Sequence, residues 1–223
     1  MKRKVFSRNT AGFTIMEAAV ILGIVGIVMG GLWGAASEMY KSRQMQQGLR
    51  QWGTIGNHIQ VIFANQAGIL GRAGLTQGLD RQNAFPTEMR RDPNKAVGIL
   101  FHPWSSKKYN GNTTHGSFGT AYVTADSCSD GGSTSAIAQP CFRITFSELP
   151  RWACIRMLVM TSSSPVAGLN RIYVNGRSQA DMVWDGITGS GAPLSIAQAI
   201  AKCDNSDNNN NYIDWIHVLA NSG

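Results

Sequence analysis

The sequence lacks the residue patterns that most enzymes and metal sites require. There is no C-x-x-C pair, and the four His residues are scattered without the spacing of metal ligands. The run 204–211 lacks the Gly and final Glu of a calcium-binding loop, and Gly189-Ser190-Gly191 is not a G-x-S-x-G nucleophile turn. No spacing indicates paired carboxylates or a Ser-His-Asp site. We therefore expect no enzyme activity, no metal site and no cofactor.

Residues 1–12 contain no acidic side chain. Four of the 20 basic side chains (Lys2, Arg3, Lys4 and Arg8) lie there, and the remaining 16 stand against 13 acidic ones, a net charge of +3. A net positive charge this small does not indicate a nucleic-acid-binding surface, so we expect no specific nucleic-acid partner. The early basic cluster indicates instead a segment that keeps the N-terminus in the cytoplasm.

Charge is also almost absent from residues 13–36, where Glu17 is the only ionisable side chain. At about 1.5 Å per residue, a helix of this length spans the ~30 Å hydrocarbon core of a bilayer. No second run of this kind follows, and a chain of 223 residues allows one domain plus an appendage. We expect a membrane segment followed by an exported domain.

Three interpretations of this segment compete. A signal peptide could be cut after Gly34-Ala35-Ala36, and a plain membrane anchor would not be cut at all. Neither gains anything from Glu17, because a carboxylate in an apolar helix costs a few kcal/mol unless it is paired. A polymerising helix does gain. If the chain is cut after Gly12, the new amine of Phe13 in one copy can pair with Glu17 of its neighbour.

The segment Gly12-Phe13-Thr14-Ile15-Met16-Glu17 resembles the processing motif of type IV prepilins. The resemblance implies that residues 1–12 are a leader, that a prepilin peptidase cuts after Gly12, and that the new N-terminus at Phe13 is methylated. It also implies that Glu17 is the carboxylate needed for assembly. A signal-anchored secreted enzyme or binding protein remains the alternative of another class.

The helical pattern continues beyond the apolar run, without proline, and predicts one helix over 13–67. The face expected to pack on the exported domain carries Leu49, Trp52, Ile55, Ile59, Ile62 and Phe63. The first half is expected to be held by lipid and then by other subunits. Close helix packing there is predicted at five glycines: Gly23, Gly26, Gly30, Gly31 and Gly34. The resemblance implies that the region near these glycines partly unwinds in the filament.

Residues 68–223 are expected to form an α+β domain with an antiparallel sheet, on which the second half of the helix packs. Strands are predicted over 120–125, 142–146, 171–174 and 212–219, with helices over 147–160 and 193–203. All four cysteines (Cys128, Cys141, Cys154 and Cys203) lie here, and an exported domain favours disulfides over metal. Cys128 and Cys141 end the loop between two predicted strands, so we pair them.

The second half of the chain resembles the type IVb pilins, which include toxin-coregulated, bundle-forming and conjugative thin-pilus pilins. The resemblance lies in a strand followed by a helix containing Cys154, and in Cys203 before a last strand. It implies a Cys154–Cys203 disulfide. The short leader and the Phe at position 13 are more like type IVa.

We therefore expect a pilin, a structural subunit of a type IV pilus serving adhesion, aggregation or conjugation. Its expected partners are other copies in a helical filament, the prepilin peptidase and pilus assembly machinery, the inner membrane before assembly, and a host or neighbouring cell surface. The precursor is expected in the bacterial inner membrane and the mature chain in the extracellular filament. A minor pilin or a type II secretion pseudopilin is the nearest alternative.

Overall fold

The computed structural model describes residues 14–63, 75–90, 100–105, 120–128, 139–186, 192–204 and 210–219. The chain divides into two units, Met1–Arg43 and Gln44–Gly223, and one helix, α1 (Ile15–Phe63), contributes residues to both. The described part of the second unit contains a five-stranded antiparallel sheet and three further α-helices. This is the predicted α+β fold, with its long N-terminal helix.

Helix α1 is continuous from Ile15 to Phe63, and the last residues of the predicted span 13–67 lie outside the described residues. In the second unit its packing face is the predicted one. Trp52, Ile55, Ile59 and Phe63 are buried, and Leu49 and Ile62 pack half-buried against the same core. Burying each large apolar side chain contributes about 1.5–3 kcal/mol, so this face fixes the second half of the helix to the sheet.

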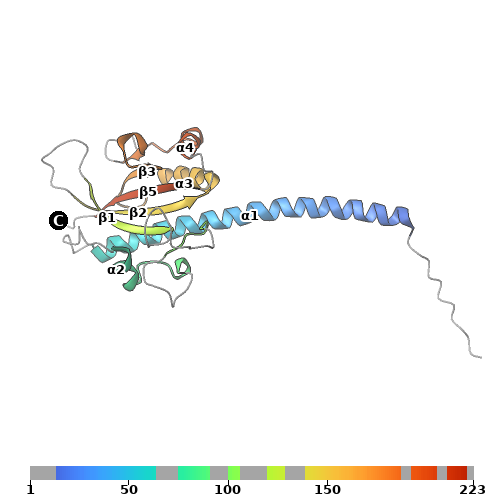
Figure 1. Ribbon diagram of the computed structural model, residues 1–223, viewed down its shortest axis with the longest axis horizontal. Helices are drawn as coiled ribbons and strands as arrows, with labels where there is room; N and C mark the ends of the chain where they lie inside the picture. Colours follow the sequence, from blue (N-terminus) through green and yellow to red (C-terminus); the bar gives the residue numbers. More distant parts are fainter. Residues whose placement is uncertain are drawn as a thin grey trace, which may run out of the picture. The chain divides into compact units, whose positions relative to one another are not determined.

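The sheet has the order β1-β2-β5-β3-β4, so the strand that comes last in the sequence lies at its centre (Figure 1). The strands are β1 (Ala121–Cys128), β2 (Gln139–Leu149), β3 (Leu169–Val174), β4 (Met182–Asp185) and β5 (Asn211–Val218). The sequence predicted all of them except β4, whose four residues are too few to show an alternating pattern.

Trp215 in β5 marks the face of the sheet on which the helices pack. Its ring centroid lies 5.7 Å from that of Trp52 in α1, and its Nε1 donates to Thr161 Oγ1 in α3 (Arg151–Ser163) at 3.1 Å. The adjacent residue Asp214 points to the opposite face, because side chains alternate along a strand. The two faces therefore differ in character, apolar and aromatic on one side and charged on the other.

Asp214 is fully buried, and neighbouring hydrogen-bond donors and arginines balance its negative charge. The hydroxyl of Thr145 donates to Asp214 Oδ1 at 2.6 Å, and Arg177 Nε lies 3.3 Å from Oδ2. Burial lowers the pKa of Arg143, whose Nε lies 3.8 Å from the same carboxylate, and the negative charge of Asp214 opposes this shift. These contacts tie β2 and β5 to the turn after β3.

The start of α3 corrects the predicted helix 147–160. Ser147 does not cap the helix; it belongs to β2, and its backbone N–H donates to the carbonyl of Thr120 at 2.9 Å. The strand continues to Leu149, which pairs with Asn211 in β5, and the helix then begins at Arg151 with Pro150 as its cap residue. Strand pairing has therefore overridden the local capping preference of serine.

Two short helices complete the described part of this unit. Helix α2 (Leu75–Arg81) lies in the connector between α1 and the sheet, followed by a single 3₁₀ turn at Thr87–Met89. Helix α4 (Ile196–Lys202) is the predicted helix within 193–203, and Ser195 caps it by accepting from the backbone N–H of Gln198. Ala199 and Cys203 face the core, so α4 delivers one cysteine to the interior.

Candidate assembly helix and disulfides

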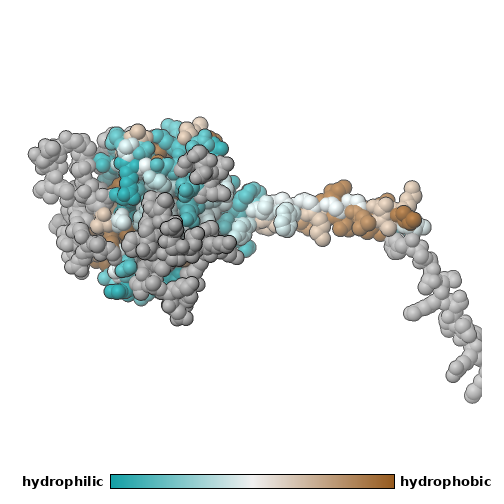
Figure 2. Space-filling view, in the orientation of Figure 1, coloured by the Kyte–Doolittle hydropathy of each residue, from teal (hydrophilic) through white to brown (hydrophobic). Residues whose placement is uncertain are grey.

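The first part of α1 is apolar and exposed along its whole length. Every residue from Thr14 to Tyr40 is exposed, with Ile15 at 91% and Trp33 at 80% (Figure 2). By length and composition α1 could cross a membrane, although a signal sequence near an N-terminus passes the same test. Burying this surface in lipid or against other chains would be strongly favourable.

The carboxylate of Glu17 folds back over the start of this helix. Its Oε2 accepts hydrogen bonds from the backbone N–H of Thr14 at 3.0 Å and from the Thr14 hydroxyl at 2.9 Å. In return, the N–H of Glu17 donates to Thr14 Oγ1 at 3.3 Å, which completes a capping box. The other carboxylate oxygen, Oε1, has no partner among the described residues and can accept from an incoming amine.

Thr14 is the functional residue that sequence reasoning missed. The T-x-x-E spacing at the start of an apolar helix is a known capping signature and could have found it. From the sequence, Glu17 is assigned only to the amine of a neighbouring copy and not to the start of its own helix. Part of its hydrogen-bonding capacity satisfies the helix start, where backbone N–H groups have no partner inside the helix.

The five glycines predicted to allow close packing have open space beside them among the described residues. A β carbon at Gly23, Gly26, Gly30, Gly31 or Gly34 would have nothing within 4 Å. The helix is regular through all of them, so the unwinding that the resemblance implies for the filament remains a prediction. Each glycine lowers helix stability by about 1 kcal/mol relative to alanine. The packing of the described residues does not require glycine at these positions, so it does not explain this cost.

The predicted cleavage site lies just before this region. Gly12 and Phe13 are outside the described residues, so cutting after Gly12 and methylation of Phe13 remain predictions. The described structure begins at Thr14. It does show that the helix starts at Ile15, immediately after the capping residue Thr14.

The Cys154–Cys203 disulfide is present and links α3 to the end of α4. Its Cα atoms are 6.0 Å apart across 49 residues of sequence, and both cysteines are fully buried. Cys141 is also disulfide-bonded, but the side chain of Cys128 lies outside the described residues. Their strands β1 and β2 are neighbours, as the predicted bridge requires, and the Cys128–Cys141 pairing stays a prediction.

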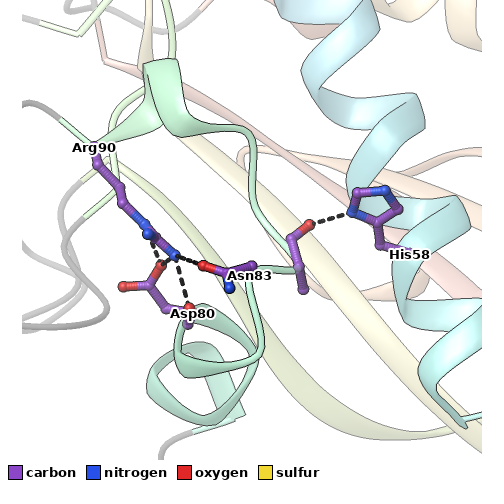
Figure 3. Close-up of polar contacts among 5 residues, drawn as sticks. His58, Asp80, Asn83 and Arg90 are labelled. Carbon is purple, nitrogen blue, oxygen red and sulfur yellow. Dashed lines mark hydrogen bonds and ion pairs between the residues drawn. The ribbon is translucent and has the colours of Figure 1, made fainter. Parts of the chain in front are cut away.

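The connector is tied down by contacts that the sequence did not reveal (Figure 3). Arg90 donates through Nε to Asp80 Oδ1 at 2.6 Å and through Nη2 to the Asp80 carbonyl at 2.7 Å, and it also contacts Asn83. His58 of α1 lies 2.9 Å through Nδ1 from the carbonyl of Ala84. Together these contacts hold the chain after α2 against the second half of α1.

No group of three His, Cys, Asp or Glu side chains within the described ranges is arranged to hold a metal ion. Between Ile15 and Ser37 of α1 the only acidic residue is Glu17, and the buried carboxylate of Asp214 is committed to Thr145 and arginines. The candidate functional feature is therefore the exposed half of α1 with its Thr14–Glu17 start.

Solved structures provide the comparison, since no protein-family model and no curated protein matches the chain. The crystal structure of a type IV b pilin from Salmonella typhi matches with a TM-score of 0.51 at 20% identity, covering 75% of this chain and 95% of that one. TcpA, a type IV pilin from the Vibrio cholerae El Tor biotype, matches with a TM-score of 0.46 at 14% identity, covering 78% and 99%. From its long helix, central last strand and likeness to the Salmonella protein, the chain has the fold of a type IV b pilin.

Proposed function

We propose that this chain is a structural subunit of a type IV pilus. A prepilin peptidase cuts it after Gly12, and the mature chain polymerises through the first half of α1. The resulting filament serves adhesion, aggregation or conjugation at a cell surface. The chain acts by assembling with copies of itself rather than by catalysis.

One observation carries this proposal: the exposed apolar half of α1 belongs to a chain with a pilin fold. A helix whose large side chains are exposed at Ile15, Met16, Ile27 and Trp33 is unstable in water and needs a partner over its whole length. Lipid supplies that partner before assembly, and the helices of other copies supply it afterwards. Residues 1–12, with their basic side chains, keep the start of the helix on the cytoplasmic side.

Glu17 sets the register between neighbouring copies in this proposal. Cleavage creates a positive amine at Phe13, and the free Oε1 of Glu17 on another copy accepts from it. In a dry helix bundle such an ion pair is strong, and a shift of register would leave both charges buried without partners. A single pair can therefore select one axial position among many similar apolar contacts.

The glycines let the helices approach closely. Gly26 and Gly30 form a G-x-x-x-G pair, and the absence of side chains there allows two backbones to come into van der Waals contact. Close approach of a second helix supplies a reason for glycines beside which the described residues leave open space.

A minor pilin or a type II secretion pseudopilin remains the second candidate, since either would use the same helix in fewer copies. The presence of Glu17 favours a main-shaft subunit, because its pairing is useful wherever one copy follows another. A signal-anchored secreted protein is the candidate of another class, and it would be cut after Ala36.

The N-terminal mass of the protein sheared from cells tests these alternatives directly. A chain beginning at methylated Phe13, recovered from filaments, is the expected result. A chain beginning at Ser37 in the soluble medium would contradict the proposal. The amount of this protein in the filaments, relative to other filament proteins, would separate a main subunit from a minor one.

A further inference from the structure

Two exposed aromatic residues mark the end of the apolar part of α1. Trp33 is 80% and Tyr40 is 64% exposed. They are seven residues apart, close to two full helical turns, so they lie on the same side of the helix. Polar contacts return between them and just beyond: Ser37 donates to the carbonyl of Gly34, and Lys41 pairs with Glu38, each at 2.8 Å.

Tryptophan and tyrosine with polar neighbours are enriched where the hydrocarbon of a bilayer meets its headgroups. Trp33 and Tyr40 are about 10 Å apart along the helix axis at ~1.5 Å per residue, which places them at successive depths of such a boundary. Along the helix the apolar run is followed by Trp33 and then by Tyr40, which lies between the paired Glu38 and Lys41. This order indicates an interface with lipid at this end of the apolar run.

The opposite boundary is given by the carboxylate of Glu17. Side chains in a helix point toward its N-terminus, and this one reaches back to the N–H of Thr14. From Thr14 to Trp33 is a rise of about 28 Å at ~1.5 Å per residue, against a hydrocarbon thickness of ~30 Å. Because the indole of Trp33 also points toward the N-terminus, the charged group and the ring are separated by about 24 Å, the rise from Glu17 to Trp33, and modest local thinning lets a bilayer match that length.

Given the proposed function, we infer that the membrane-resident precursor holds α1 in a lipid bilayer with Trp33 at the outer hydrocarbon boundary and the Glu17 carboxylate at the inner one. Tyr40 then lies among the outer headgroups. The carboxylate is solvated at the inner headgroup layer before assembly, so the membrane-resident precursor bears no buried charge. Only extraction into the filament brings Glu17 into a dry environment, where the amine of a neighbour replaces the headgroups.

Fluorescence quenching of the full-length precursor in phosphatidylcholine–phosphatidylglycerol vesicles tests the outer boundary. The lipids carry bromine atoms either next to the headgroup or near the end of the acyl chain. The protein has six tryptophans, so the signal of Trp33 is taken as the difference between the wild type and Trp33→Phe. Shallow bromines should quench this difference signal at least twofold more than deep ones.

Moving the indole by one turn provides the matched control. In Trp33→Phe/Met29→Trp the new ring should lie about 6 Å deeper, and the deep bromines should become the better quenchers. Equal or stronger deep quenching of Trp33 itself would overturn the inference. So would the absence of quenching by either lipid, which would mean that other copies or water, not lipid, surround the ring.

The inner boundary is tested with nitroxide labels on the same precursor. A label at Ala18→Cys should be relaxed more strongly by a water-soluble nickel complex than a label at Ile24→Cys. The reverse order would place Glu17 in the hydrocarbon and contradict the inference. Filament formation and the N-terminal mass report the proposed function independently, so either result can fail without the other.

Discussion

The ring of Trp104 occupies the space that a β carbon on Gly48 would need. Gly48 is buried in α1, and Trp104 packs over it while meeting Trp152 of α3 edge to face at 6.2 Å between ring centroids. Next to this contact, Gln44 Nε2 donates to the carbonyl of Pro103 at 3.1 Å. The connector and α3 therefore meet α1 at Gly48, where the missing side chain leaves room for the ring of Trp104.

The substitution Gly48→Ala should lower the free energy of unfolding by about 1–3 kcal/mol, because the added methyl group would overlap the indole ring. Gly53 is the matched control, since it lies in the same helix with nothing within 4 Å of a β carbon. Gly53→Ala should raise the free energy of unfolding by about 0.5–1 kcal/mol through better helix propensity. Denaturant unfolding of the full chain in detergent measures both. Similar effects at the two positions would contradict the Trp104 contact.

His217 should make the fold sensitive to acid. Its ring stacks on Phe142 at 5.0 Å and lies 5.9 Å from Trp52, and burial lowers its pKa from 6.5 to about 3, with the backbone of Ala167 acting in the opposite direction. The unfolded chain therefore binds a proton between pH 6.5 and about 3 that the folded chain does not. Stability is complete above this range and is lost as the pH falls through it, by at most about 1.4 kcal/mol per pH unit.

The variant His217→Phe isolates this effect, because it keeps an aromatic ring on Phe142 but cannot be protonated. As the pH falls from 6.5 toward 3, the free energy of unfolding of the wild type should decrease relative to that of the variant, whatever the difference between them at neutral pH. A constant difference between the two proteins over this range would show that His217 does not titrate on unfolding.

Glu17→Gln should separate the two roles of this side chain. Glutamine can still accept from Thr14 and keep the capping box, but it carries no charge for the amine of Phe13. We expect the variant, like Glu17→Ala, to be cut by the peptidase yet to form no filaments. Electron microscopy and the N-terminal mass provide the two readouts. Normal filaments from Glu17→Gln would rule out a register set by charge.

Replacing Cys154 and Cys203 together by alanine should cost about 4 kcal/mol of stability, since the bond closes a loop of about 50 residues in the unfolded chain. Both sulfur atoms are buried, so reductant should attack the native protein only as fast as it unfolds. A peptide map without reductant should contain this bridge and a Cys128–Cys141 bridge. Any other pairing would contradict the assignment of both.

The sequence was most informative where one physical constraint acts alone. The uninterrupted apolar run ending in a three-and-four-residue pattern predicted α1 and its packing face from Trp52 to Phe63, because both follow from helical geometry. Strands with clear alternation, such as β5, were found for the same reason. The one missed strand, β4, is held by its pairing with β3, a long-range cause with no local trace.

Apart from the Cys154–Cys203 disulfide, the contacts between distant segments were not predicted. Ser147 has the composition of a cap, yet pairing with Thr120 keeps it in a strand. Likewise, nothing in the sequence links Arg90 to Asp80 or Trp104 to Gly48, since these pairs depend on how the connector folds back. At the candidate site the reverse holds. Thr14 and Glu17 are local partners, and a closer look at their spacing would have found the capping box.

The position of β5 has a consequence for how the domain comes into being. Its neighbours β2 and β3 pair with it and not with each other, so neither side of the sheet can join the other until Asn211–Val218 arrives. Almost the whole chain is therefore synthesised before the sheet can be completed. Until then the β1–β2 pair and the β3–β4 pair each keep an unpaired edge, and the last strand joins them into one sheet.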